Sequence, residues 1–199
     1  MQYGCGCKPS KMDGTEHKYE YKKTQLPTTF SYVSVMPPIT DQGSTSKCVC
    51  HALTAYLDWN KNQFEGDNNG GQFDIDALYA IRADKKTEGM QIKEALAFLR
   101  HEGLNKAKIK EYALVGSELA LKQALIMNGP CPLALPVKNE GNEFWKGNHV
   151  YGGHCVLAVG YNQNGFILRN SWGRDFGENG YILFPYKDFN DIIEIWTIL

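Results

Sequence analysis

A cysteine at the start of a predicted helix is the residue of this sequence best suited to covalent chemistry. Cys48 follows the polar stretch DQGSTSK at residues 41–47, and apolar residues at helical spacing come after it. These are Val49, Ala52, Leu53 and Tyr56, which predict a helix to about residue 64. The N–H groups and dipole of a helix N-terminus stabilise an anion, so the thiol pKa should fall below its usual value of about 8.5. Cys48 is therefore a candidate nucleophile, with a buried structural thiol as the alternative.

A nucleophilic thiol needs a base, and His154 is the candidate that the sequence offers. His154 follows two glycines and opens an apolar run that predicts a strand, so a structural histidine is the alternative. The next predicted strand ends at Asn170, whose carboxamide can hydrogen-bond the imidazole and fix its orientation. Trp172 can cover that contact from water. Cys48, His154 and Asn170 thus fit the nucleophile, base and orienting group of a catalytic triad.

Helices in the first part of the chain and strands in the second must position these residues. Further helices are predicted from a cap at Asp74, over 92–103, and from a cap at Ser117 to about residue 128. Apolar runs between turn residues predict antiparallel strands at 133–137, 155–161, 166–170, 181–184 and 192–197. This order predicts an α+β fold, with a helical lobe (about 40–110) packed against a sheet or barrel lobe (about 111–199) and a cleft between them.

Composition and charge narrow the class of protein. The chain has 199 residues, of which 43% are hydrophobic, enough for one domain or two closely packed lobes. Its 21 basic and 22 acidic side chains give a net charge of -1, which argues against a nucleic-acid partner. No long apolar run predicts a membrane span, and the N-terminus lacks the hydrophobic region of a secretion signal. We therefore expect a cytoplasmic location, with export by another route as the alternative and the oligomeric state open.

The N-terminal residues differ from the rest of the sequence. Residues 1–25 are rich in Lys, Gly, Glu and Tyr and have no apolar periodicity. Such a stretch predicts a flexible or surface-lying extension. The catalytic domain is then expected to span residues 26–199.

Six cysteines raise the question of disulfides or a metal site. Two Cys-x-Cys pairs occur, Cys5/Cys7 and Cys48/Cys50, and His51 follows the second. Zinc ligands are usually spaced by about two to four residues, and ligands closer than that strain a tetrahedral site. The chain is also too long for a small disulfide scaffold. We therefore expect free thiols and no metal or other cofactor.

Three motifs together resemble those of the papain-like cysteine peptidases. They are Gln42-Gly43-Ser44 with Cys48 six residues after the glutamine, Gly153-His154, and the run NSWGRDFGENGY at residues 170–181. The family also has its cysteine, histidine and asparagine in this order. The resemblance covers about residues 26–199. It implies a two-lobe papain-like fold and a cysteine-type peptidase that binds a peptide or protein substrate in an extended conformation.

The resemblance implies a role for each matching residue. Cys48 would be the nucleophile, His154 the general acid and base, and Asn170 the residue that orients the imidazole. The Gln42 side-chain amide and the backbone N–H of Cys48 would form the oxyanion hole. Hydrolysis would then proceed through a thioester on Cys48 that water cleaves with the help of His154.

Substrate-binding positions are implied in the same way. Gly89, Met90, Gln91 and Ile92 match the segment that pairs with an extended substrate. Ala134 and Gly152, with Gly153 beside them, match the pocket for the second residue before the cut, and Trp172 and Phe176 match an apolar wall for residues after it. A lining of Met90, Ile92 and Ala134 predicts a medium-sized apolar side chain in the pocket. Met90 and Ile92 covering the helical core is the alternative.

Several departures from the family pattern bear on regulation. Thr45-Ser46-Lys47-Cys48-Val49 stands where the family signature is Cys-Gly-Ser-Cys-Trp, so the usual disulfide is missing, as in proteins of reducing compartments. Residues 1–25 are too few for a folded helical propeptide. We therefore expect control by compartment and expression rather than by a blocking tail. Two alternatives to a peptidase are an acyl transferase of the transglutaminase kind that uses the same thiol, and a non-catalytic peptide-binding relative.

Overall fold

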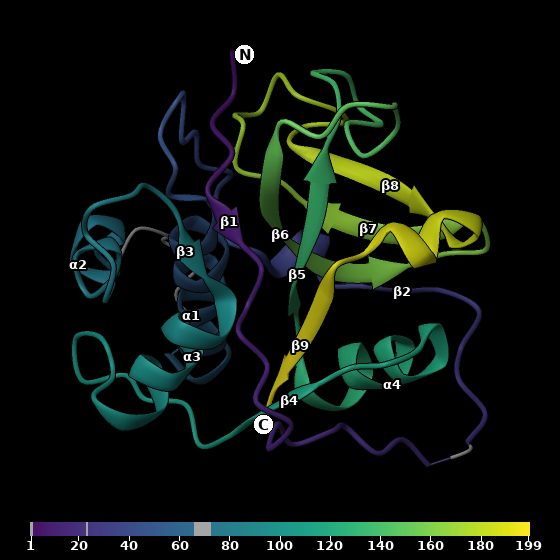
Figure 1. Ribbon diagram of the computed structural model, residues 1–199. Coiled ribbons are helices and arrows are strands. Elements are labelled where there is room, and N and C mark those ends of the chain that lie inside the picture. The colour runs from purple at the N-terminus through teal and green to yellow at the C-terminus, as the bar shows by residue number, and fades with distance from the viewer. Residues whose placement is uncertain (1, 23, 66–72) are drawn as a thin grey trace.

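The computed structural model describes residues 2–22, 24–65 and 73–199. Three helices lie on one side of the molecule: α1 (Cys48–Glu65), α2 (Ile75–Ala80) and α3 (Ile92–His101). The sheet and α4 (Glu118–Asn128) lie on the other side (Figure 1). The α+β class is confirmed, although short strands also stand before α1 and before α3, and the proposed domain boundaries stay predictions.

The sheet of the second lobe is antiparallel throughout its described strands. Its order is β4 (Tyr112–Leu114), β9 (Glu194–Ile198), β5 (Cys131–Val137), β6 (Gly152–Tyr161), β7 (Gly165–Arg169) and β8 (Tyr181–Pro185), and β2 (Phe30–Ser31) also pairs with β6. Two 3-10 helices, η1 (Val33–Val35) and η2 (Tyr186–Asp191), lie in the connections. The central strand β6 begins with the two glycines that precede His154, so the sheet fixes the position of the candidate base.

Helix α1 carries Cys48 into the interior. The helix is buried around its whole circumference from Cys48 to Trp59, because it lies between the sheet and the other two helices of its lobe (Figure 1). The apolar spacing in the sequence predicted a helix with one buried face. In the structure every residue from Cys48 to Trp59 is buried, so this part of the helix has no exposed face. This burial holds the N-terminus of α1 rigidly against β6.

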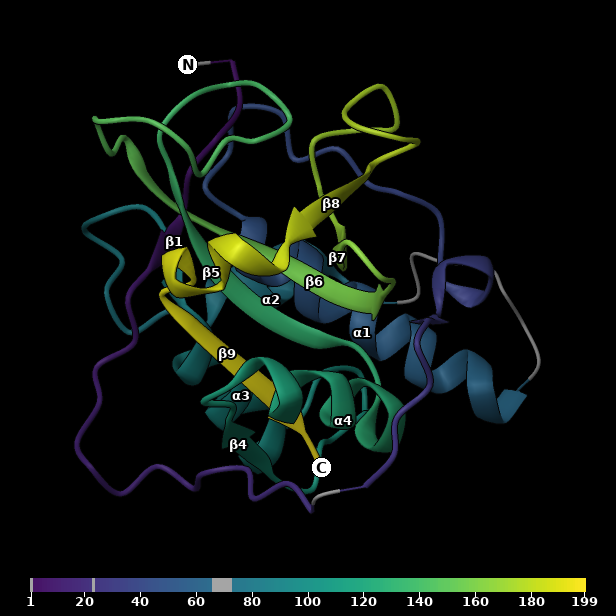
Figure 2. The same ribbon diagram turned by 90° about the vertical axis from the view of Figure 1, so that its right-hand side faces the viewer.

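The predicted helix starts at Asp74 and Ser117 are confirmed by their capping contacts. The Asp74 carboxylate accepts hydrogen bonds from the backbone N–H groups of Asp76 and Ala77. The Ser117 hydroxyl accepts one from the N–H of Ala120, and α4 ends before Gly129, whose φ is 107°. α4 lies along β9 and belongs to the sheet side of the molecule (Figure 2).

The N-terminal segment passes between the two lobes. Its strand β1 (Cys7–Lys8) pairs in parallel with β3 (Met90–Gln91), which directly precedes α3. In Figures 1 and 2 this segment runs along the molecule from the end where the chain starts to the opposite end. In the described part of the chain no helix combines the length and apolarity needed to cross a bilayer.

Candidate active site

The imidazole of His154 and the carboxamide of Asn170 are in direct contact. His154 Nε2 lies 2.7 Å from Asn170 Oδ1, which also accepts a hydrogen bond of 2.8 Å from the backbone N–H of Ser171. Since that oxygen is an acceptor, Nε2 carries the proton and donates it. Trp172 stacks on the imidazole with a centroid distance of 4.3 Å and shields the contact from water. The side chain of His154 is fully buried.

The remaining ring nitrogen of His154 is left for the thiol. Nδ1 is buried and has no hydrogen-bond partner among the described residues. The Cys48 sulfur accepts a hydrogen bond from the backbone N–H of Cys155, the residue after His154. α1 and β6 thus place the Cys48 sulfur against the backbone of the residue that follows His154, and the catalytic triad stays a prediction. In this tautomer the free lone pair of Nδ1 can take the thiol proton.

The side chain of Gln42 is held in one orientation by hydrogen bonds at both ends of its amide. Its Oε1 accepts a hydrogen bond of 2.6 Å from the Ser171 hydroxyl, and its backbone N–H donates to the Ser171 carbonyl. Its Nε2 donates to the carbonyl oxygens of Thr45 at 2.7 Å and Gly4 at 3.1 Å. The amide N–H therefore already holds a peptide carbonyl, which is the task of an oxyanion donor.

The expectation of a low thiol pKa at Cys48 is wrong for this state of the molecule. Burial is the largest cause and raises the pKa of Cys48 to about 12. Hydrogen bonds from the backbone of Cys155, Gly6 and Val49 act in the opposite direction but do not offset burial. The sequence reasoning considered the helix N-terminus and not the cover over it. The thiol is in its neutral form as long as water is excluded.

The cover is the N-terminal strap, residues 3–8, which lies extended along the cleft. Tyr3 stacks on Trp172 at a centroid distance of 4.7 Å and meets Phe176 edge-on at 5.4 Å. The N–H of Gly4 donates to the Gly43 carbonyl, and the Gly6 carbonyl accepts from the Met90 N–H at 2.8 Å. These contacts contradict a wholly flexible or surface-lying extension, because Gly4, Gly6 and Cys7 are buried. The missed signal is the paired Gly-Cys repeat, which fits a narrow groove.

Three glycines assigned to substrate binding are in fact where the strap comes closest. A Cβ on Gly153 would stand 2.2 Å from the Cys7 carbonyl oxygen, and one on Gly89 would stand 2.5 Å from that of Gly6. On Gly152 it would meet the Cys5 Cβ at 2.8 Å. Larger residues at these positions would push an extended peptide out of the groove. The groove is therefore shaped for a peptide backbone.

The predicted pocket residues divide into two groups. Met90 turns its sulfur toward Cys50 at 3.6 Å, and Ile92 starts α3 within the same hydrophobic core, so their side chains serve the helical lobe. Ala134 pairs with Cys155 on one side and with Glu194 on the other. Gln91 lies beside the strap and accepts a hydrogen bond from the backbone N–H of Lys11.

A buried carboxylate that the sequence reasoning missed lies at this pocket. Glu194 is 5% exposed, and its charge adds to the raised pKa of Cys7, after a hydrogen bond with Cys155 and burial. Its Oε1 accepts from the backbone N–H of Ser10, and its Oε2 accepts from Trp196 Nε1 at 2.6 Å. A carboxylate therefore lies next to a residue predicted to line an apolar pocket, since Glu194 pairs with Ala134 across the sheet. Glu194 was overlooked because it begins a strand whose other residues are mostly apolar.

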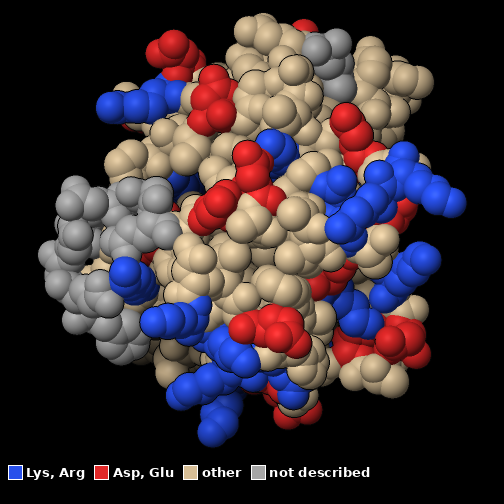
Figure 3. Space-filling view, turned by 90° about the vertical axis from the view of Figure 1, so that its left-hand side faces the viewer, with Lys and Arg blue, Asp and Glu red and all other residues tan. Residues whose placement is uncertain are grey.

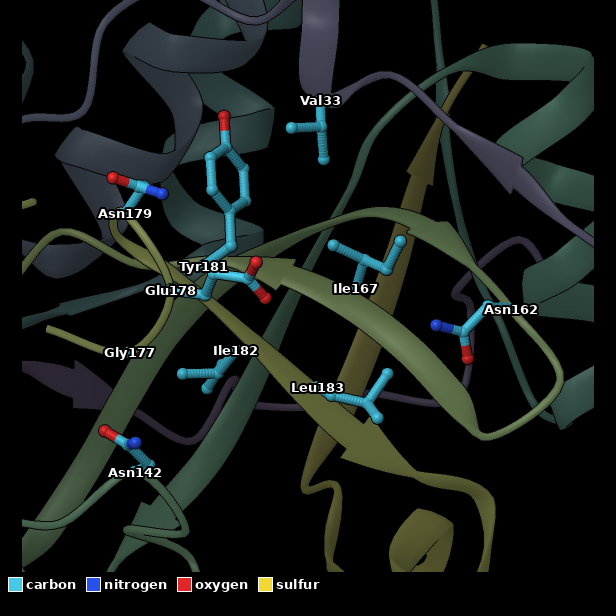
Figure 4. Close-up of a pocket in the computed structure, with 10 residues that line it drawn as sticks. All are labelled: Val33, Asn142, Asn162, Ile167, Gly177, Glu178, Asn179, Tyr181, Ile182 and Leu183. Carbon is cyan, nitrogen blue, oxygen red and sulfur yellow. The ribbon is translucent and has the colours of Figure 1, made fainter.

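Other candidate sites in the described residues lack this chemistry. No group of three or more His, Cys, Asp and Glu side chains is arranged to hold a metal ion in the described ranges. A cavity of about 670 Å³ lies beside β7 and β8, and Ile167, Ile182, Leu183, Glu178 and Asn179 are among the residues that line it (Figure 4). None of the triad residues lines it.

The buried imidazole gives a testable dependence of stability on pH. Burial lowers the pKa of His154 to about 4, although the hydrogen bond with Asn170 raises it. The unfolded chain, with a pKa near 6.5, binds the proton more readily, so this contribution is present above about pH 6.5 and is lost as the pH falls toward 4. We expect the wild type to lose about 2 kcal/mol more unfolding free energy between pH 7 and 5 than His154→Gln does.

Urea unfolding of both proteins at the two pH values measures this difference. Contributions from carboxylates and from His51, whose pKa is also lowered to about 4 by burial, are common to both proteins and cancel. Equal losses in the wild type and the variant would contradict a buried neutral imidazole.

Comparisons with known proteins agree with this geometry. Residues 14–192 match the family model described as papain family cysteine protease. Cysteine proteinase 3 of Entamoeba histolytica is 29% identical over 213 aligned residues, which cover 85% of this chain and 66% of that protein. Procathepsin L of Rattus norvegicus is 26% identical, over 74% of this chain and 50% of that protein.

A solved structure has the same fold along nearly the whole chain. Xylellain, a cysteine protease from Xylella fastidiosa, superposes with a TM-score of 0.78 at 21% identity and covers 99% of this chain and 96% of its own. By contrast, the chain spans about two thirds or less of the curated relatives named above. The match over most of its length to the family model nevertheless decides the family: this chain belongs to the papain family of cysteine proteases.

Proposed function

We propose that this chain is a peptidase that cleaves peptide bonds through a thioester on Cys48. One observation carries the proposal. His154, hydrogen-bonded to Asn170, directly precedes Cys155, whose backbone lies against the Cys48 sulfur, and the Gln42 amide donates to a carbonyl of the strap, an extended peptide. Membership of the papain family supports the same activity.

The geometry suggests a sequence of steps once the strap has left the groove. The proton of the Cys48 thiol passes to Nδ1 of His154, and the thiolate attacks the substrate carbonyl carbon. The oxygen that gains negative charge accepts hydrogen bonds from Gln42 Nε2 and from the Cys48 N–H. His154 then gives its proton to the leaving amine. In the second half, His154 takes a proton from water, which attacks the thioester and releases the acid.

The described state is, in this proposal, the closed one. The strap uses the donors of the groove: Gln42 Nε2 for the Gly4 carbonyl and the Met90 N–H for the Gly6 carbonyl. A substrate needs the same donors, so strap and substrate compete for the groove. The sequence predicted that activity is controlled by compartment and expression. We propose instead that opening of the strap limits activity.

The finer proposal concerns the pocket that the Cys7 side chain enters. Glu194 Oε1 accepts from the N–H of Ser10, two residues beyond the strap, and is free to accept from a cation once the departing strap draws Ser10 away. A buried carboxylate in a pocket favours a basic side chain over a neutral one. We therefore expect Lys or Arg at the second position before the cut to be preferred over leucine. Charges of both signs are mixed on the face of the helical lobe shown in Figure 3, so the pocket rather than a surface field would set this preference.

A peptide library tests both the activity and the preference. The full chain and a chain lacking residues 1–8 are each incubated with the library, and the new ends are read by mass spectrometry. We expect cleavage, faster in the shortened chain, with Lys and Arg enriched at the second position. Glu194→Gln should lower kcat/KM for an Arg substrate about tenfold or more, because a hydrogen bond to a charged group is lost. The matched leucine substrate should change little.

Other outcomes favour the alternative functions. Products joined to an added amine, with little hydrolysis, would favour an acyl transferase. Binding of the library without any product would favour a non-catalytic relative. Equal loss on the Arg and leucine substrates in Glu194→Gln would contradict the basic pocket.

We also propose a reducing compartment, such as the cytoplasm, for the active form. All six cysteines of the sequence lie in the described ranges and all are free thiols. Disulfides are rare where thiols are kept reduced.

A further inference from the structure

Three thiols from different parts of the chain meet where the strap crosses β6. Cys7 comes from the strap, Cys155 from β6, and Cys48 from the start of α1. Cys7 is 5% exposed and the other two are buried completely or nearly so. The peptidase chemistry uses the Cys48 thiol alone. Cys7 and Cys155 are therefore buried thiols to which the reaction assigns no role.

Cys7 and Cys155 face each other across the groove. The Cys155 side chain is the largest cause of the raised pKa of the Cys7 thiol, so the two side chains are neighbours, and the Cys7 and Cys155 thiols lie 3.9 Å from the carbonyl oxygens of Lys8 and Val156. The backbone placement agrees, because a Cβ on Gly153 would lie 3.6 Å from the Cys7 Cβ. Gly153 and Cys155 are two residues apart on β6 and so point to the same face of the strand. The Cys155 side chain is thus the next one along the face that Cys7 packs against.

We propose that Cys7 and Cys155 form a reversible disulfide that locks the strap in the cleft under oxidising conditions. This inference rests on the proposed function in one respect, since the locked groove is the substrate groove. The bond itself depends only on the position of the two thiols.

The oxidant is a low-molecular-weight disulfide such as glutathione disulfide. When the strap opens, the Cys7 thiolate attacks one sulfur of the oxidant, a Cys7–glutathione bond forms, and one glutathione thiolate leaves. After the strap returns, the Cys155 sulfur attacks the Cys7 sulfur and displaces the second glutathione. Two protein thiols are oxidised, one glutathione disulfide is reduced to two thiols, and the two thiol protons end on glutathione. Reduced glutathione reverses both steps.

The other thiols are less suited to pair with Cys7. Cys5 is half-buried and lies beside Gly152, two residues along the strap from Cys7. Cys50 directs its thiol toward the Met90 sulfur. The Cys48 sulfur accepts backbone hydrogen bonds, one of them from Gly6 of the strap itself. The raised pKa values of Cys7 and Cys155 also favour a stable disulfide, since their thiolates are poor leaving groups.

The test uses the full chain carrying Cys48→Ala, so that neither peptidase activity nor the active-site thiol interferes. The protein is equilibrated with glutathione disulfide, remaining thiols are blocked in denaturant, and a non-reducing tryptic digest is analysed by mass spectrometry. We expect the peptides that carry Cys7 and Cys155 to be linked. Hydrogen exchange at the Met90 amide, which donates to Gly6 of the strap, should slow about tenfold or more on oxidation.

Matched cysteine-to-serine variants show which thiols form the disulfide. Cys5→Ser lies two residues from Cys7 on the same strap and should keep both the link and the slower exchange. Cys7→Ser and Cys155→Ser should each lose both, and Cys7→Ser avoids the risk that a change in β6 harms folding. Cys7 remaining free, carrying glutathione alone, or linked to Cys5 would overturn the proposal, and so would a link that leaves Met90 exchange unchanged. A link in the Cys48→Ala chain, together with no peptide cleavage by the chain that keeps Cys48, would instead refute the proposed function and leave the lock standing.

Discussion

Cys48→Ala is expected to reduce peptide hydrolysis to the background rate. Removing a catalytic nucleophile costs about 10⁶-fold in kcat in the serine protease for which it has been measured, because the remaining groups have no bond to form. The measurement is turnover of a fluorogenic peptide by the chain lacking residues 1–8, in which the groove is open. An epoxide that alkylates nucleophilic thiolates, added first, should label the parent chain once and the Cys48→Ala chain not at all.

Cys50→Ala is the matched control for this change. Cys50 is on the same helix, is fully buried and directs its thiol toward Met90, so it differs from Cys48 in facing the core instead of the groove. We expect it to keep both turnover and labelling. Turnover that survives in Cys48→Ala, or is lost in both variants alike, would contradict the assigned nucleophile.

The architecture was predictable where local signals are strong. Caps at Asp74 and Ser117 mark helix starts because their side chains hydrogen-bond N–H groups two or three residues away. The pairing of β1 with β3 joins residues 7 and 90. A strand of two residues has no local sequence pattern that could specify a partner so far away along the chain. The sequence therefore predicted the lobes and not the segment between them.

The candidate site could be predicted where its residues stand in local sequence motifs, and not where it depends on contacts with distant segments. Cys48, His154 and Asn170 stand in motifs that identify the family, and the contact of His154 with Asn170 follows from adjacent strands. The pKa of Cys48 could not be predicted, because it depends on the strap, which arrives from another part of the chain. Ser171 was also missed, although its place directly after Asn170 puts its hydroxyl on Gln42.

Gln42→Ala is expected to lower kcat about 10²- to 10³-fold while KM changes little, because the amide donor acts on charge that develops only in the transition state. The strap complicates the full chain, since Gln42 also holds the Gly4 carbonyl and its loss would loosen the closed state. Steady-state kinetics are therefore measured in the chain lacking residues 1–8. In that shortened chain, the loss of the oxyanion donor is the one effect of Gln42→Ala that we expect on the kinetics.

Ser171→Ala tests the hydroxyl that supports the Gln42 amide separately from the amide itself. It keeps the Gln42 donor and removes the hydroxyl that fixes its orientation, so a loss of about tenfold, near the value of one hydrogen bond, is expected. Gln42 Nε2 stays tied to the Thr45 carbonyl in that variant, which limits how far the amide can turn. A Gln42→Ala enzyme that loses affinity but keeps kcat would show that Gln42 binds the ground state. Equal losses in the two variants would mean that Gln42 has no donor role apart from its packing against Ser171.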